Sequence, residues 1–133
     1  MTDAAANERE IRALLDAWAA AVRARDLPAI LAHHSPDLRM FDVPPPFESR
    51  GLEAYAQTWD LFYSVQHGPV AFEIDRLEIV AGDDVAFAVA HLHCADEDAD
   101  GQPVPLDVRL TVGLRKIDAR WTIVHEHHSV PTG

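Results

Sequence analysis

The sequence predicts an α+β fold in which three N-terminal helices pack against a curved antiparallel sheet. Apolar residues recur at helical spacing in the first half of the chain, whereas apolar and polar residues alternate from Val70 onward. The alternation reverses between Ile74 and Leu77, which predicts a bulge near Asp75-Arg76 and a bend in the sheet. Helices followed by strands are typical of α+β proteins, and a bent sheet covered by helices would form a cone.

Three helical patterns occupy the first half of the chain. They predict helices over roughly residues 4–25, 27–33 and 51–65. Thr2 or Asp3 would cap the first helix, and Asp26 would cap the second with Pro28 in its first turn. The apolar faces consist of Ile11, Leu14, Leu15, Trp18 and Val22 in the first helix and of Leu52, Tyr55, Trp59, Phe62 and Tyr63 in the third.

The rest of the chain has the composition of strands. These are expected over roughly residues 38–43, 70–79, 85–95, 103–115 and 121–131. Pro44-Pro45-Pro46 must leave the sheet, because consecutive prolines offer no backbone donors. The acidic run from Asp96 to Gly101 is expected to be an exposed loop.

Composition limits the classes of partner. The chain has 133 residues, 48% of them hydrophobic, and we expect one domain over residues 1–133 with a substantial core. A net charge of −11 argues against nucleic acid as a partner. The polar, acidic start is unlike a signal peptide, and no stretch is apolar enough to span a membrane. The single cysteine, Cys94, fits a reducing cytoplasm and is expected to be a small core residue.

The last strand has two different faces. Strict alternation puts Trp121, Ile123, His125 and His127 on one face and Thr122, Val124, Glu126 and His128 on the other. Since neither face suits plain water, we expect one to meet a ligand pocket and the other a packing or dimer surface. Glu126 and His128 would form a proton-handling pair inside a cavity, or an inert pair if they are exposed at the strand end.

Asp42 is the candidate general base. It follows Phe41 at the end of the first strand, where a carboxylate held among Phe41, Trp18 and Trp59 would be desolvated and would bind a proton more tightly. The alternative is a turn in which Asp42 accepts backbone N–H groups of the proline loop. Trp18, Tyr55 and Trp59 would line a ligand cavity or simply fill the core.

Two His-x-His pairs suggest a metal site. His91 and His93 share one strand face, as do His125 and His127, but an intervening strand would separate the pairs by about 9–10 Å. We therefore favour no metal, and keep His91 as a candidate ligand-binding residue. The other histidines, His33, His34 and His67, are expected at helix ends or in loops and exposed to solvent.

The element order resembles the SnoaL-like branch of the nuclear transport factor 2-like superfamily. The motifs that carry the resemblance are Phe41-Asp42-Val43-Pro44-Pro45-Pro46, the helix from Gly51 to Trp59, and the segment from Trp121 to Pro131. The ending is also similar to the association domain of calcium/calmodulin-dependent protein kinase II. The resemblance implies a cone-shaped fold, a hydrophobic pocket and a homodimer. The kinase domain implies further that Glu126 and His128 face the cavity, which leaves His125 and His127 on the convex side.

Ketosteroid isomerase offers the closest mechanistic comparison within this superfamily. The resemblance implies that Asp42 occupies the position of the aspartate base. Trp18 stands where that enzyme has a helix-one tyrosine, Trp59 where it has another pocket tyrosine, and Val112 about where it has a protonated acid. Both oxyanion donors are therefore replaced, so steroid isomerisation would need the Trp18 N–H or His128 as a substitute.

Two main hypotheses follow for the function. The first is a cofactor-independent isomerase or lyase acting on a small apolar molecule, with Asp42 as base, Glu126 and His128 as proton-handling partners, and Trp18, Tyr55, Trp59, His91 and Val112 as ligand-binding residues. The second is a non-catalytic ligand-binding or assembly module that uses the same pocket. A metal-dependent enzyme is a third, less favoured class.

Overall fold

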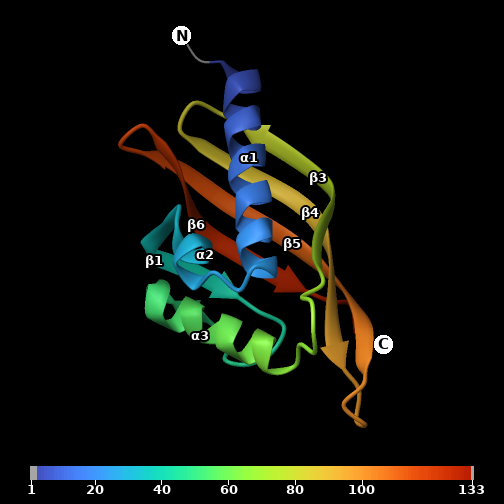
Figure 1. Ribbon diagram of the computed structural model, residues 1–133. Coiled ribbons are helices and arrows are strands. Elements are labelled where there is room, and N and C mark those ends of the chain that lie inside the picture. The colour runs from blue at the N-terminus through green and yellow to red at the C-terminus, as the bar shows by residue number, and fades with distance from the viewer. Residues whose placement is uncertain (1–2, 133) are drawn as a thin grey trace.

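The computed structural model describes residues 3–132, and Figure 1 shows three helices lying across one face of a six-stranded sheet within that range. The elements are α1 (Ala4–Arg23), α2 (Leu27–Leu31), β1 (His34–Phe41), β2 (Ser49–Arg50), α3 (Gly51–Ser64), β3 (Phe72–Ala81), β4 (Val85–Glu97), β5 (Pro103–Ile117) and β6 (Arg120–Ser129). The three predicted helices are thus present, with ends that differ by one or two residues.

Acidic caps begin the first two helices. The Asp3 side chain accepts a hydrogen bond from the Ala6 amide at 3.1 Å, and Asp26 accepts one from the Ala29 amide at 3.2 Å. Each cap satisfies one of the amides that a helix start leaves without an intrahelical partner. Thr2, the other predicted cap of α1, lies outside the described residues.

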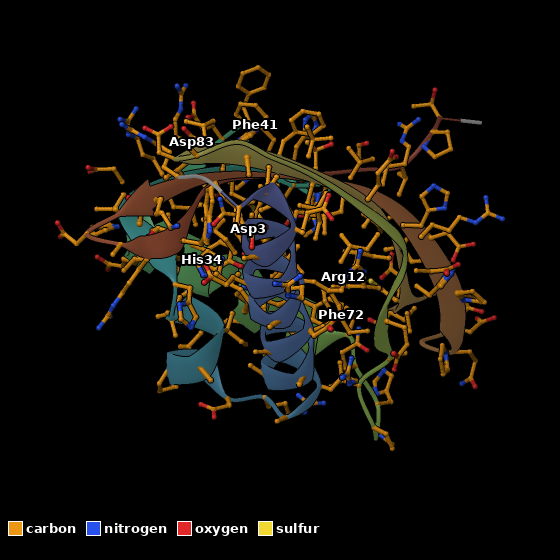
Figure 2. The ribbon with its side chains drawn as sticks, turned by 90° about the horizontal axis from the view of Figure 1, so that it is seen from above. Asp3, Arg12, His34, Phe41, Phe72 and Asp83 are labelled. Carbon is orange, nitrogen blue, oxygen red and sulfur yellow. The ribbon has the colours of Figure 1, made fainter. Side chains whose placement is uncertain are left out.

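The sheet has the strand order β2-β1-β6-β5-β4-β3. Strands β3 to β6 form an antiparallel meander, whereas β1 joins β6 in parallel. Figure 2 shows the sheet arched over α1, with His34 and Phe72 on the helix side and Phe41 on the opposite, convex side. The predicted bulge is confirmed, because the β3–β4 register shifts between Asp75 and Glu78, and Arg76 has a φ of 52°.

The first strand begins earlier than predicted. It starts at His34 rather than Leu38 and runs through Pro36, because β6 pairs with its first residue, His34, and the Ile123 amide donates to the His33 carbonyl at 2.6 Å. The strand ends at Phe41, so Asp42 is the first residue beyond it.

A bulge in β6 corrects the predicted faces of the last strand. Gly113 of β5 pairs with His125 and Leu114 pairs with Ile123, so Val124 is an extra residue without a β5 partner. Side chains on either side of a bulge change face. Trp121 and Ile123 are therefore buried on the same side as Glu126 and His128, whereas strict alternation had placed the two pairs on opposite sides. His125 and His127 remain on the convex side, as the resemblance implied.

The core lies between the helices and the concave face of the sheet. Its fully buried side chains include Ile11, Leu15, Ile30, Leu92, Leu110 and Ile123. The apolar face predicted for β5 is confirmed at Val108, Leu110, Val112 and Leu114, all of which are buried. No helix among the described residues is long and apolar enough to cross a membrane.

Candidate functional site

A cavity of about 290 Å³ opens where α3 meets the ends of the sheet strands. Most of its lining is apolar, and no lysine or arginine belongs to it. The lining residues are Met40, Asp42, Val43, Pro44, Thr58, Trp59, Leu61, Phe62, Val65, Phe72, Cys94, Ala95, Asp96, Leu106, Val108 and His128. A smaller hollow of about 130 Å³ adjoins it, sharing Asp42, Pro44, Thr58 and Leu61, and adds the polar side chains of Glu48, Ser49 and Gln57.

Asp42 lies in the wall of this cavity. The Val43 amide donates to Asp42 Oδ1 at 2.8 Å, which is the local turn contact proposed as the alternative to a catalytic role. Both descriptions therefore apply to the same side chain. Burial raises the pKa of the Asp42 carboxyl, while the nearby His128 and the Val43 amide oppose that shift without cancelling it. The result is a partly buried carboxylate that binds a proton more tightly than an exposed one.

Glu126 is the centre of a buried hydrogen-bond network beneath the cavity. Its side chain is 0% exposed, and it accepts from three groups. The Tyr55 hydroxyl lies 2.7 Å from Oε2, His34 Nε2 lies 2.6 Å from Oε2, and His128 Nε2 lies 2.8 Å from Oε1. Burial alone would raise the pKa of Glu126, but the hydrogen bonds and charges of His128 and His34 outweigh it and lower the pKa to about 2. Glu126 is therefore a buried carboxylate that stays ionised.

His128 connects this network to the cavity. Its Nε2 atom is bonded to Glu126 while its ring belongs to the cavity lining. Burial lowers the pKa of His128, but the hydrogen bond and charge of Glu126, together with the charge of Asp42, raise it above the ordinary value. Nδ1 makes no hydrogen bond to any residue within 3–132, so it is free to meet a ligand.

The aromatic residues divide into a cavity wall and a layer behind it. Trp59 lines the cavity, whereas Trp18 and Tyr55 do not. The Trp18 indole donates to the Tyr55 hydroxyl at 3.0 Å, and the Trp18 and Trp59 rings pack edge to face with centroids 6.1 Å apart. Burial raises the pKa of Tyr55 well above its ordinary value, and the charge of Glu126 raises it further, so Tyr55 stays a neutral donor. Trp18 and Tyr55 thus support the site from behind.

Two predicted ligand-binding residues lie away from the cavity. His91 is exposed on the convex face of β4, because Leu92 and Cys94 occupy the concave face and adjacent strand residues point to opposite sides. Val112 lies on β5, and its side chain is buried in the core on the concave face of the sheet. Val108, on the same strand, lines the cavity, but Val112 does not.

The histidine pairs lie apart on the convex side. His125 and His127 pack against Phe41, with ring centroids 4.9 and 5.2 Å away. On β4, His93 contacts Asp107 at 2.7 Å and Asp75 at 3.3 Å. Strand β5 lies between β4 and β6, so the two pairs do not converge.

Sequence reasoning missed His34 and the cavity position of Cys94. His34 was expected to be exposed after a helix, but β1 begins at this residue and its side chain is buried against Glu126. Only the parallel pairing of β1 with β6, a long-range contact, reveals this position.

Burial raises the pKa of the Cys94 thiol to about 12, so this residue is a neutral part of the wall and not a nucleophile.

Comparison with known proteins gives one family. The family model described as the SnoaL-like domain matches residues 11–133. A nuclear transport factor 2-like protein of unknown function from Pseudomonas putida KT2440 is 34% identical, covering 99% of this chain and 92% of that chain, with a TM-score of 0.87. No curated protein matches the chain significantly.

Two more distant structures have the same fold. A putative calcium/calmodulin dependent protein kinase II association domain from Xanthomonas campestris is 21% identical over 92% of this chain and 86% of that chain, with a TM-score of 0.76. A ketosteroid isomerase-like protein from Erwinia carotovora atroseptica SCRI1043 is 20% identical over 94% of this chain and 96% of that chain, also with a TM-score of 0.76. The predicted α+β cone is confirmed by these likenesses.

Proposed function

The chain belongs to the SnoaL-like domain family, and on that premise we propose that it is a cofactor-independent isomerase or lyase acting on a small, largely apolar carbonyl compound. Asp42 acts as the general base, and His128 stabilises the charge that develops on the substrate. One observation carries this proposal: the titratable side chains of Asp42 and His128 line the same predominantly apolar cavity. The pKa values of both groups are raised, and ionisable groups with shifted pKa values within a pocket are typical of catalytic sites.

The cavity favours a small and uncharged ligand. Its volume of about 290 Å³ is at the lower end of the ~300–1,000 Å³ found for small-molecule sites. With no lysine or arginine in the lining and with Asp42 and Asp96 present, a carboxylate or phosphate would meet repulsion. A neutral ring system with one carbonyl group fits the wall formed by Trp59, Phe62 and Phe72.

The proton chemistry follows from the positions of the two groups. Asp42 accepts a proton from the carbon next to the substrate carbonyl, and the electron pair of that C–H bond moves to the carbonyl oxygen. Protonated His128 donates from Nδ1 to this oxygen, because its Nε2–H is already committed to Glu126. In an isomerisation, the electron pair returns from the oxygen and forms a C–H bond at another carbon with the proton that Asp42 releases. In an elimination, the returning pair forms a C=C bond, the leaving group departs with the electrons of its own bond to carbon, and it takes up the proton held by Asp42.

His128 takes the donor role because the two positions that supply the oxyanion donors in ketosteroid isomerase, occupied here by Trp18 and Val112, offer none. The Trp18 N–H is bonded to the Tyr55 hydroxyl, and Val112 is an apolar core residue. An oxyanion donor is worth about 3–4 kcal/mol of transition-state stabilisation, so its loss would be measurable. His128 should therefore contribute to the reaction as much as Asp42 does.

The test is hydrogen–deuterium exchange at carbon in small cyclic ketones incubated in D₂O with the protein. We expect wild type to accelerate exchange, Asp42→Asn to lose at least about 10²-fold of that acceleration, and Asp37→Asn, an exposed aspartate on β1, to keep it. Ligand affinity should persist in Asp42→Asn. If wild type binds these ketones but Asp42→Asn exchanges them as fast, Asp42 is not the base and the non-catalytic binding module is the better description.

We also propose that the protein is a homodimer that associates through the convex face of the sheet. Val85, Phe87 and Val89 on β4 and Val80 on β3 are large apolar side chains that remain exposed there. Phe87 pairs across the sheet with Val80 and Gly113, so these residues form a continuous surface. Contiguous apolar surface of this kind is typical of protein interfaces.

A further inference from the structure

We propose that His34 is the buried counter-ion of Glu126, and that it thereby acts as a positioning residue that leaves His128 free to exchange a proton in the cavity. This inference rests on the proposed role of His128 at the substrate. His34 itself is not among the residues that line the cavity, and it contacts Glu126, which does not line it either.

The contacts of His34 fix the protons on its ring. Its Nδ1 lies 3.2 Å from the Ala32 carbonyl oxygen and its Nε2 lies 2.6 Å from Glu126 Oε2, and its side chain is fully buried. A carbonyl oxygen and a carboxylate oxygen both accept hydrogen bonds, so both ring nitrogens must donate. An imidazole that donates from both nitrogens is a cation.

Both carboxylate oxygens of Glu126 accept hydrogen bonds from other groups, which favours its ionised form. Tyr55 receives the Trp18 N–H and therefore turns its own hydroxyl hydrogen to Oε2, at 2.7 Å. His128 donates to Oε1 at 2.8 Å. With three donors on its two oxygens, Glu126 is satisfied as an anion, and His34 supplies the one positive charge that neutralises it.

This charge balance determines what His128 can do. A buried carboxylate without another counter-ion would hold a neighbouring imidazole permanently protonated. Because His34 already compensates Glu126, His128 can gain or lose its Nδ1 proton while its Nε2–H stays on Glu126. Within residues 3–132, the other titratable groups that line the cavity together with His128 are Asp42, Asp96 and Cys94, and Tyr55 contacts Glu126.

The two histidines therefore have different roles. His34 supplies the positive charge that compensates Glu126, and His128 gains or loses the proton on its Nδ1. A proton passing between Asp42 and His128 Nδ1 leaves the total charge of the site unchanged, which avoids creating an uncompensated charge in a mostly apolar cavity.

The test is ¹⁵N NMR of the imidazole rings, without any substrate. In wild type at pH 7 we expect both nitrogens of His34 to be protonated, and Nε2 of His128 to keep its proton whether or not Nδ1 carries one. In His34→Gln, whose amide can still donate to Glu126 without a charge, we expect the titration midpoint of His128 to rise by about one pH unit or more. His67→Gln, at an exposed histidine paired with Glu97, is the matched control and should leave His128 unchanged.

Either of two results would overturn the proposal. One is a neutral His34 ring in wild type, which can be measured even if His34→Gln fails to fold. The other is an unchanged His128 midpoint in a folded His34→Gln variant. Both readouts are independent of turnover, so a missing ketone exchange reaction would count against the proposed function alone.

Discussion

The Tyr55 hydroxyl donates to Glu126 across 2.7 Å, although the two residues lie 71 positions apart in the chain. This hydrogen bond joins α3, which forms one wall of the cavity, to β6, which lies beneath it. Trp18 of α1 bonds to the same hydroxyl, so three elements meet at one phenol oxygen. The cavity wall is therefore fixed by polar contacts as well as by packing.

Replacing Tyr55 and replacing Glu126 should lower the free energy of unfolding by different amounts. Tyr55→Phe loses the hydrogen bond to the charged Glu126 and the acceptor of the Trp18 N–H, and should lower the free energy of unfolding by about 1–3 kcal/mol. Glu126→Gln leaves His34 as a buried cation without its carboxylate and should cost about 3–5 kcal/mol. Urea unfolding monitored by tryptophan fluorescence measures both, and an equal loss in the two variants would contradict the charge assignment.

Stability should be greatest between about pH 4.5 and 6.5. The pKa of Glu126 falls from 4.5 to about 2 on folding, so its contribution is present above pH 4.5 and is lost as the pH falls toward 2. The pKa of His128 is raised above 6.5, so its contribution is present below 6.5 and is lost as the pH rises through the folded value. Asp42, whose pKa is raised above 3.8, also favours the folded state at lower pH.

Urea unfolding at pH 3, 5.5 and 8 tests this dependence. The shift at Glu126 corresponds to about 3 kcal/mol, of which more than half should disappear between pH 5.5 and 3 in wild type, because pH 3 still lies above the folded pKa of about 2. Glu126→Gln removes this carboxylate, so the difference in stability between wild type and the variant should shrink at pH 3. A difference that does not depend on pH would show that Glu126 contributes through packing and not through its charge.

Trp18 and Trp59 allow a matched comparison of hydrogen bonding. Both are buried, but the Trp18 indole donates to Tyr55, whereas Trp59 Nε1 makes no hydrogen bond within residues 3–132. Replacing each with Phe removes a similar ring volume. We expect Trp18→Phe to lower the free energy of unfolding by about 1 kcal/mol more than Trp59→Phe does. Equal losses, or a greater loss at Trp59, would mean that the Trp18–Tyr55 contact contributes little.

The proposed dimer is tested by charge on the convex face. Phe87→Lys should convert the dimer to a monomer in size-exclusion chromatography with light scattering, because a lysine in an apolar interface would be desolvated without a partner. Phe47→Lys is the control, since Phe47 is 97% exposed in the loop after the prolines and lies off that face. A wild-type monomer at micromolar concentration would disprove the dimer directly.

Local patterning predicted most of the fold because the buried faces repeat regularly. The bulge at Asp75-Arg76 was visible because the apolar parity reverses between Ile74 and Leu77, and the register shift confirms it. The bulge at Val124 in β6 could not be predicted, because the residues that follow it are polar. Polar residues can face either a pocket or solvent, so their alternation does not show which face is buried. The alternation of apolar and polar residues reveals a bulge only where one face of the strand is clearly apolar.

The site was less predictable because its contacts are long-range. Asp42 was identified from its position at the end of the first strand and His128 from its pairing with Glu126 on one face of the last strand, and both line the cavity. Glu126 was identified too, but as a proton-handling residue and not as a fully buried anion with three donors. His34 was missed because nothing near it in sequence shows that a carboxylate 92 residues later meets its ring.

The parallel pairing of β1 with β6 has a consequence for synthesis on the ribosome. The antiparallel hairpins from β3 onward can form as each one emerges, but β1 must wait for β6, the last strand of the described chain. Until then, Leu38 and Met40 lie on an unpaired strand edge, and His34 lacks its contact with Glu126. We therefore expect nascent chains stalled before Arg120 to be sensitive to protease throughout the segment around β1, and to become resistant in a single step once β6 is released.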